Sequence, residues 1–412
     1  MKRALQGLTF RGKAFIAVGA GIAVGAGLAG QRDLLRIAVL LIVLPLLAAY
    51  LAGRTRFRLG CERSVRPHHV PLGTVAEVEL TITNLSPVRT GTLLLSDAVP
   101  PELGIAAHRV LERVEAGGAR ATSYPLRADQ RGRFEIGPLS VTAVDPFGLV
   151  RLTRSFQSTE PVLVVPRVIP LPDSGLRADH RGRGDGAAAT LAARGQDDVV
   201  PRDYRHGDDL RRIHWRASAR AGELMVRREE QPWTNQATVM VDLREGCHGG
   251  SGPSASVELA LSIAASTAVH LLRHGWQVRV VREDGLALAP LATGIDGEIS
   301  VLEALAVTDL SDNEDVSPAA VRGDLVVAII CADARAIAAM TGAASRTPGQ
   351  LGLAVVLDTG AWWVDDALLG QDAARELTAC GWRATAVGPG TDVPAAWQEI
   401  TSDAATLSGA RR

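Results

Sequence analysis

Two uncharged apolar runs near the N-terminus constrain the fold of this 412-residue chain more than any other feature. They cover residues 14–30 and 37–52, and a short charged stretch separates them. Each run is close to the roughly 20 residues that a helix needs to cross a bilayer. The first run is rich in Gly and Ala, which let a neighbouring helix approach closely. We therefore expect a transmembrane helical hairpin in residues 1–54, with helices at about 14–30 and 34–52.

The charges that flank the apolar runs predict the orientation of this hairpin. The first 58 residues carry nine Lys or Arg and a single acidic residue, Asp33, and most of the basic residues lie before the first run or after the second. The positive-inside rule then places both ends of the hairpin in the cytoplasm. This predicts a multi-pass protein of the plasma (inner) membrane whose soluble domains are cytoplasmic. A cleaved signal peptide shares the basic start, but the second run would still anchor the chain.

Length and cysteine usage set further limits. A chain of 412 residues exceeds what one hydrophobic core usually spans, and an apolar fraction of 47% supports folded domains. The cysteines stand far apart in the sequence and in no ligand spacing, so the sequence predicts neither a disulfide framework nor a zinc site. They are Cys61, Cys247, Cys331 and Cys380.

Residues 55–170 carry the pattern of an antiparallel β-sandwich. Apolar and polar side chains alternate with period two, most clearly in residues 75–84, and Pro and Gly turns separate the short runs. The turn Asp145-Pro146-Phe147-Gly148 ends one strand, and we expect Phe147 to fill the core. Residues 171–198 are rich in Gly, Ala and mixed charge and are predicted to form a flexible linker.

Residues 237–400 alternate apolar strand-like runs with helical stretches, which predicts a doubly wound α/β domain with a mainly parallel sheet. Residues 401–412 are expected to be a disordered tail. Functional groups of such sheets gather at the carboxyl ends of the strands, where this chain offers acidic residues. These are Asp242, Glu283, Asp284, Asp333 and Asp358.

Such carboxylates are the ligands that divalent cations prefer. Asp242, Asp333 and Asp358 are therefore weak candidates for a metal site. The alternative is that they cap helices and populate loops. Arg244 follows Asp242 at the place where a metal site would need a hydroxyl ligand, and its positive charge disfavours a cation. No cofactor is expected on this basis.

The most charged stretch lies in the segment 199–236, where 14 of the 29 residues from 202 to 230 carry a formal charge. Arg guanidinium groups pair bidentately with carboxylates, so the segment can form an ion-pair network that fixes Trp215. A net charge of only +2 over this stretch does not favour nucleic-acid binding. A catalytic or metal site at His206, Asp208 and His214 is the alternative, although no nucleophile has a diagnostic setting.

The same segment contains a long motif of spaced Tyr, Gly-Asp, Arg, Ile, Trp and Ser-Ala-Arg residues. They are Tyr204, Gly207, Asp208, Arg211, Ile213, Trp215, Ser218, Ala219, Arg220, Leu224 and Val226. This motif resembles the signature of the family called domain of unknown function 58, and the resemblance extends to the turn 145–149 and to the two-helix N-terminus. The resemblance implies a membrane-anchored protein with a β-sandwich and a von Willebrand factor A like domain, often encoded beside a MoxR-type AAA+ ATPase and sometimes a transglutaminase-like membrane protein. It implies no known reaction.

The sequence thus favours a non-enzymatic, membrane-tethered adaptor that docks a MoxR-type ATPase or its client, with the segment 199–236 as the recognition or domain-locking element. The alternative hypothesis is a metal-dependent hydrolase or another enzyme centred on the same segment.

Overall fold

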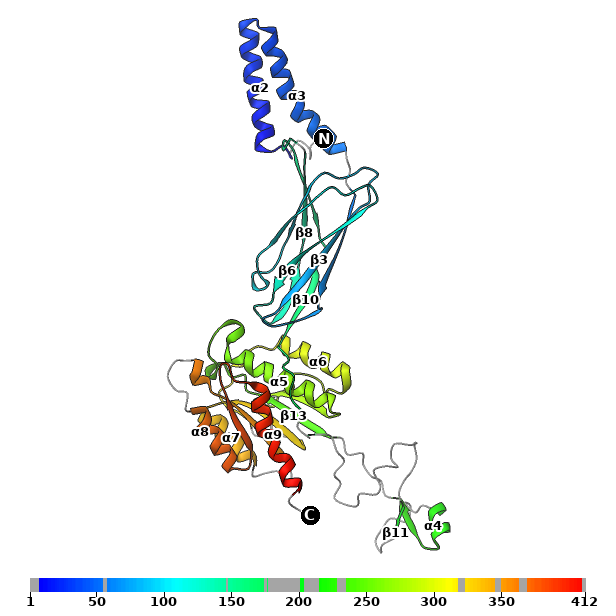
Figure 1. Ribbon diagram of the computed structural model, residues 1–412, viewed down its shortest axis with the longest axis vertical. Helices are drawn as coiled ribbons and strands as arrows, with labels where there is room; N and C mark the ends of the chain where they lie inside the picture. The colour runs from blue at the N-terminus through cyan, green and yellow to red at the C-terminus, as the bar shows by residue number, and fades with distance from the viewer. Residues whose placement is uncertain are drawn as a thin grey trace.

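The fold is that of a computed structural model in which three parts follow one another along the long axis of the molecule (Figure 1). They are an N-terminal helical hairpin, a β-rich part (59–165) and an α/β part (235–409). The structure describes residues 7–54, 58–145, 147–173, 176, 201–203, 215–227, 235–317, 323–344, 350–362 and 369–409.

The hairpin consists of α2 (Phe10–Ala29) and α3 (Arg32–Arg54), so both expected helices are present and slightly longer than predicted. Gly19 lets the helices touch, because a Cβ atom there would lie 2.8 Å from Cγ1 of Ile42. Large apolar side chains are exposed along both helices, as for surfaces that face lipid. Both helices are long and apolar enough to cross a membrane.

Three sheets make up the β-rich part, in the orders β1-β3-β6, β2-β10-β7 and β5-β4-β8-β9. They surround one apolar core, as expected for a sandwich, and β3 buries Val78, Leu80 and Ile82 on its predicted inner face. All pairings are antiparallel except that of β10 with β2. The strands are β1 (Leu59–Arg66), β2 (His69–Pro71), β3 (Val75–Asn84), β4 (Leu93–Asp97), β5 (Ala107–Leu111), β6 (Ala119–Arg127), β7 (Gly132–Ile136), β8 (Leu139–Val144), β9 (Arg151–Phe156) and β10 (Glu160–Val165).

The turn that follows β8 contacts the base of the hairpin. The Thr9 hydroxyl donates to the carbonyl oxygen of Gly148 at 2.7 Å, and the Thr9 amide donates to that of Leu149 at 2.9 Å. Leu149 is buried in a small cluster with Ala49 and Val150. Phe147, by contrast, is 64% exposed, so the prediction that it fills the core is wrong. The contact with the hairpin turns Leu149 inward and leaves Phe147 outside.

The α/β part contains a five-stranded, fully parallel sheet in the order β14-β13-β15-β16-β17. Its buried, uninterrupted apolar strands are typical of sheets covered on both faces. The strands are β13 (Gln236–Val241), β14 (Gln277–Arg282), β15 (Leu325–Cys331), β16 (Leu351–Leu357) and β17 (Arg383–Val387). The helices are α5 (Ser256–Arg273), α6 (Gly294–Ala306), α7 (Ala334–Ala344), α8 (Leu369–Ala379) and α9 (Val393–Gly409).

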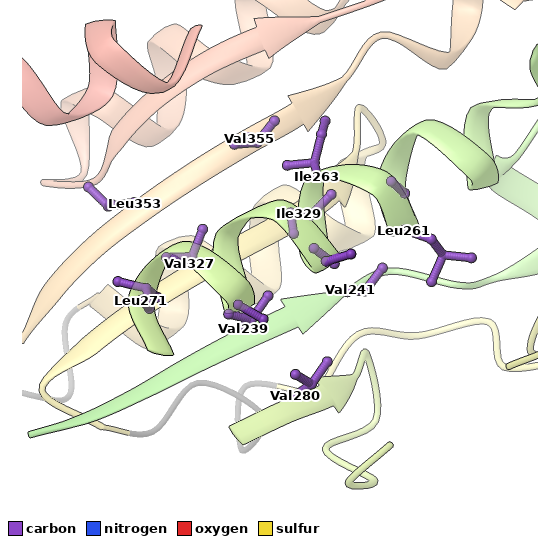
Figure 2. Close-up of a cluster of buried hydrophobic side chains, with 14 of the residues drawn as sticks. Val239, Val241, Leu261, Ile263, Leu271, Val280, Val327, Ile329, Leu353 and Val355 are labelled. Atoms are coloured by element: carbon purple, nitrogen blue, oxygen red, sulfur yellow. The ribbon is translucent and has the colours of Figure 1, made fainter. Parts of the chain in front are cut away.

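Helices cover both faces of this sheet, which confirms its doubly wound character. One face packs against α5, α6 and α9, and the other packs against α7 and α8. Figure 2 shows α5 lying over the sheet, with Leu261 and Ile263 near side chains of β13, β15 and β16. Helix α9 extends to Gly409, into the stretch for which we expected a disordered tail. In its first turns, the side chains of Trp397 and Ile400 are buried.

The first residues of the expected linker also pack onto the α/β part. Leu171 contacts its core, and Leu176 is buried there and accepts a hydrogen bond from the Trp276 indole at 2.8 Å. The rest of the stretch, 177–198, lies outside the described residues.

Arg131 connects the β-rich part to the α/β part. It lies between β6 and β7, and its guanidinium donates to the carbonyl oxygens of Leu305 and Thr308, at 2.5 and 2.7 Å, where α6 ends. It also donates to Glu258 on α5 at 3.3 Å. The unpaired carbonyls at the end of a helix attract a cation, so Arg131 holds the two parts together.

Candidate functional site

The strand order of the sheet determines where a site can form. The chain runs from β13 to β14 on one side and then crosses to β15 on the other, so the carboxyl ends of β13 and β15 flank a topological switch point. Ligands of open α/β sheets bind at such points. Asp242 directly follows β13, and Asp333 follows β15 by two residues. The structure brings these two sequence-predicted carboxylates together.

Arg244 lies between them. Its Nε donates to Oδ1 of Asp242 at 2.8 Å and its Nη2 donates to Oδ2 at 2.7 Å, while Nη2 also donates to Asp333. Its Nη1 donates to the carbonyl oxygen of Glu314 at 3.0 Å. Burial alone would lower the pKa of Arg244, but the hydrogen bonds to the two carboxylates outweigh it and raise the pKa. The guanidinium is therefore a permanent cation in this cluster.

Backbone amides donate further hydrogen bonds to the carboxylates of this cluster. Cys331 donates its amide to Asp242 at 3.2 Å, and Asp333 accepts the amides of Arg335 and Ala336 at the start of α7. Glu283 is fully buried at the end of β14 and accepts the amide of Leu243 at 3.1 Å. These bonds fix the loops that hold the carboxylates.

This geometry does not fit a divalent cation at the switch point. A hard cation needs several oxygen ligands around it, and the carboxylates of Asp242 and Asp333 already bind the guanidinium of Arg244. Asp358, the third weak candidate, is buried after β16. Among the described residues, two groups of side chains lie close enough together to bind an ion, Asp242–Cys247–Asp333 and Cys247–His248–Cys331, and Asp358 belongs to neither. The arginine supplies the positive charge that a metal would bring.

Asp284 neighbours this cluster on the exposed side. Hydrogen bonding to Arg282 outweighs partial burial and lowers its pKa to about 2. Asn313 links it to the cluster, because its amide nitrogen donates to Glu283 at 2.9 Å and to Asp284 at 3.2 Å. The carboxylates of Asp242, Asp333, Glu283 and Asp284, which lie close to Arg244 and Arg282, thus all have defined hydrogen-bond partners.

A thiol pair that the sequence did not predict lies beside the ion pair. Cys247 and Cys331 stand 84 positions apart, yet their sulfur atoms are 2.8 Å apart. His248 is buried next to them, with Nε2 3.8 Å from the Cys331 sulfur. Burial lowers the pKa of His248, which favours the neutral ring. Spacing along the chain gave no signal for this cluster, because only the strand order brings its members together.

The signature segment forms a small unit of β11 (Pro201–Asp203), α4 (Trp215–Ala221) and β12 (Met225–Arg227). β11 pairs with β12, and the Ser218 hydroxyl accepts the amide of Met225 at 2.8 Å. Figure 1 draws this unit beyond the α/β part, at the end away from the hairpin. Ser218 therefore helps to fold the segment locally.

Trp215 begins α4 with 69% of its surface exposed, and Ala219 and Arg220 on the same helix are exposed as well. The other predicted signature residues, and the histidines of the alternative enzyme hypothesis, lie outside the described residues. They are Tyr204, Gly207, Asp208, Arg211 and Ile213, together with His206 and His214.

Comparisons with solved structures give low similarity. The chain is similar to the CARDB domain of a Pyrococcus furiosus protein solved in complex with di-metal ions, at 16% identity and a TM-score of 0.21, over 26% of this chain and 93% of that one. It is also similar to the putative ApaA protein from Bordetella pertussis, at 9% identity and a TM-score of 0.20, over 26% and 94% of the two chains. No curated protein matches this chain.

The family comparison is more specific. The match covers residues 200–339, which include the signature segment, the strands β13 and β15 and the whole Asp242–Arg244–Asp333 cluster. Residues 200–339 of this chain thus match the family described as Protein of unknown function DUF58.

Proposed function

We propose that this protein is a membrane-anchored adaptor whose signature segment docks another protein. The observation that carries the proposal is the exposure of Trp215, 69% of whose surface is accessible on a helix that also exposes Arg220. Trp and Arg are the residues most enriched among those that dominate binding energies. Exposing a tryptophan to water has no benefit for folding, because its burial would stabilise the chain.

The fixed contacts between the three parts support this proposal. Thr9 joins the hairpin to the β-rich part, and Arg131 joins the β-rich part to the α/β part. These contacts would hold the α/β part, from which the signature segment extends, away from the membrane that the hairpin would span.

The ion pair at the switch point supports a role that needs no metal. The finer assignment that we propose for the α/β part is a von Willebrand factor A like domain in which Arg244 replaces the cation that binds between carboxylates. If no cation binds at the switch point, a partner protein is recognised by side chains and not through a bound metal. This agrees with docking through the signature segment.

The partner that we propose is a MoxR-type AAA+ ATPase or its client, with a transglutaminase-like membrane protein as a further neighbour. We propose that the soluble parts lie in the cytoplasm, where such an ATPase finds its nucleotide. The family resemblance in the signature segment supports this choice of partner.

Flotation of lipid vesicles tests the proposal. Vesicles that carry the full chain with its soluble parts outward are mixed with a purified MoxR-type ATPase and separated on a density gradient. We expect the ATPase to float with these vesicles and to stay at the bottom with empty ones. Equal flotation with both vesicles, or flotation with neither, would contradict the proposal.

A further inference from the structure

We propose that Cys247 and Cys331 form a reversible disulfide when the protein meets a peroxide, so that the switch point of the sheet carries an oxidisable dithiol site. This inference does not depend on the docking role, because it concerns a reaction within the α/β part alone.

The two sulfur atoms are already in contact. Their separation of 2.8 Å is only about 0.8 Å longer than a disulfide bond. Cys331 ends β15, and its backbone amide donates a hydrogen bond to the Asp242 carboxylate, while the Cys247 amide donates to the Arg244 carbonyl oxygen at 3.2 Å. Only a small movement of the turn Glu245–Cys247 is needed to join them.

The neighbouring histidine favours a dithiol over a metal site. Its Nε2 lies 2.8 Å from the carbonyl oxygen of Asp242, which can only accept, so Nε2 must carry the proton. Its Nδ1 lies 3.0 Å from the Ser256 hydroxyl and accepts from it. No lone pair of His248 is therefore left for an ion held by the two sulfurs.

A permanent cation strengthens this preference. Arg244 binds both carboxylates that lie near the Cys247 sulfur among the described residues: Asp242, whose Oδ1 is 3.8 Å from it, and Asp333, within 4.8 Å of it. A metal ion at the sulfurs would have to compete with the guanidinium for these carboxylates. Two thiols that touch, and whose neighbouring ligands are already bound, form a disulfide more readily than a metal site.

The exposure of the two thiols indicates which of them reacts first with the peroxide. Cys247 is partly exposed, whereas Cys331 is fully buried. The hydrogen bond from Cys247, together with burial, raises the pKa of the Cys331 thiol well above its ordinary value. Reactivity towards peroxides follows thiolate character and access, so Cys247 reacts first.

The chemistry has two steps. In the first, the Cys247 sulfur attacks one oxygen of hydrogen peroxide, the O–O bond breaks, and Cys247 becomes a sulfenic acid while the other oxygen leaves as water. In the second, the Cys331 sulfur attacks the Cys247 sulfur, the S–O bond breaks, and the hydroxyl leaves as a second water with the Cys331 proton. Two thiols are oxidised, and one peroxide is reduced to two waters.

The cross-link would join the turn after β13 to the end of β15. These segments hold Asp242 and Arg244 on one side and lead to Asp333 on the other. Oxidation would therefore lock the switch point, as expected of the transient, redox-sensing disulfides that occur in reducing compartments.

Peptide mapping of the full chain in lipid nanodiscs tests the proposal. The protein is reduced, treated with hydrogen peroxide, alkylated with N-ethylmaleimide and digested without reductant. We expect a linked Cys247–Cys331 peptide pair that dithiothreitol reverses, and a rise of several degrees in Tm because the bond closes a long loop. Peroxide treatment that leaves both cysteines open to alkylation, or oxidises them singly, would overturn the proposal.

Variants and zinc provide the controls. Cys247→Ser should abolish the rise in Tm, whereas Cys380→Ser, which changes an exposed cysteine, should keep it. One equivalent of Zn²⁺ should not protect the pair from N-ethylmaleimide. Protection by Zn²⁺ that is lost in His248→Ala would show a metal site instead and overturn the proposal. The peptide map of the unaltered protein decides the question even if a variant fails to fold.

Discussion

The Arg244 guanidinium contacts both carboxylate oxygens of Asp242, at 2.8 and 2.7 Å, in a pair that is almost fully buried. The pair stands at the switch point of the parallel sheet, where ligands of this kind of fold bind. A buried charge without its partner is strongly destabilising. The two residues therefore depend on each other, and the sheet edge needs no added cation.

Replacing Arg244 by serine should make the α/β part depend on a divalent cation. Arg244→Ser leaves Asp242 buried without its countercharge, and we expect the free energy of unfolding to fall by about 3–5 kcal/mol. Mg²⁺ or Mn²⁺ should restore part of this loss, because the site then offers a hydroxyl and two carboxylates. Denaturant unfolding with and without the ion measures both effects.

Arg279→Ser is the matched control for this variant. Arg279 is exposed on β14, so its loss removes the same charge without uncovering a buried carboxylate. We expect a change of under about 0.5 kcal/mol and no response to the ion. Stabilisation of the unaltered protein by Mg²⁺ to the same degree would show that Arg244 does not replace a cation.

Removing the Arg131 side chain should loosen the contact between the β-rich and α/β parts. Arg131→Ala leaves the carbonyl oxygens of Leu305 and Thr308 without their donor. We expect small-angle scattering to show a broader distribution of shapes, with little change in secondary structure. Arg133→Ala, at an exposed position on β7, should scatter as the unaltered protein does. Identical scattering of both variants would contradict the role given to Arg131.

A larger side chain at Gly12 should detach the hairpin from the β-rich part. A Cβ atom there would lie 2.5 Å from the carbonyl oxygen of Leu149, which is backbone and cannot easily move. In Gly12→Val we expect faster hydrogen exchange at the Thr9 and Arg151 amides, which bond across this junction. Gly25→Val, on the same helix with open space around it, is the control. Unchanged exchange in Gly12→Val would exclude a tight junction.

Acid should destabilise the α/β part through His270 on α5. Burial, followed by the charge of His274, lowers the pKa of His270 to about 4. The unfolded chain binds this proton below about pH 6.5 and the folded chain does not, so stability is complete above that pH and falls between about pH 6.5 and 4.

The expected loss is on the order of 3 kcal/mol across this window. Urea unfolding at several pH values measures it, and His270→Gln should flatten the dependence. His68→Gln, at an exposed position, should leave the dependence as it is. A slope that His270→Gln does not change would assign the acid sensitivity to other groups.

Much of the fold follows from local patterns in the sequence. The helices of the hairpin and the strands of the parallel sheet are uninterrupted apolar runs, and β3 alternates with period two. The meeting of Asp242 and Asp333 could be predicted because parallel strands place their carboxyl ends at one edge. The obstacle that Arg244 presents to a cation was also visible in the sequence.

The remaining features depend on packing between distant segments. Cys247 meets Cys331 only because β13 and β15 are neighbours, and Arg131 finds the end of α6 only after two parts of the chain have folded. Phe147 is exposed because the turn that carries it contacts the hairpin through Thr9. Periodicity and spacing contain no information on such contacts.

The most direct test of the account is the affinity of the full chain, held in lipid nanodiscs, for a purified MoxR-type ATPase, measured for Trp215→Ala and for Ile295→Ala. Both residues are largely exposed and apolar, but Ile295 lies on α6 outside the signature segment. We predict that Trp215→Ala raises Kd about 30-fold or more, as for a residue that dominates an interface, and that Ile295→Ala changes Kd by less than about twofold. An unchanged Kd for Trp215→Ala, or an equal loss in both variants, would contradict docking through the signature segment.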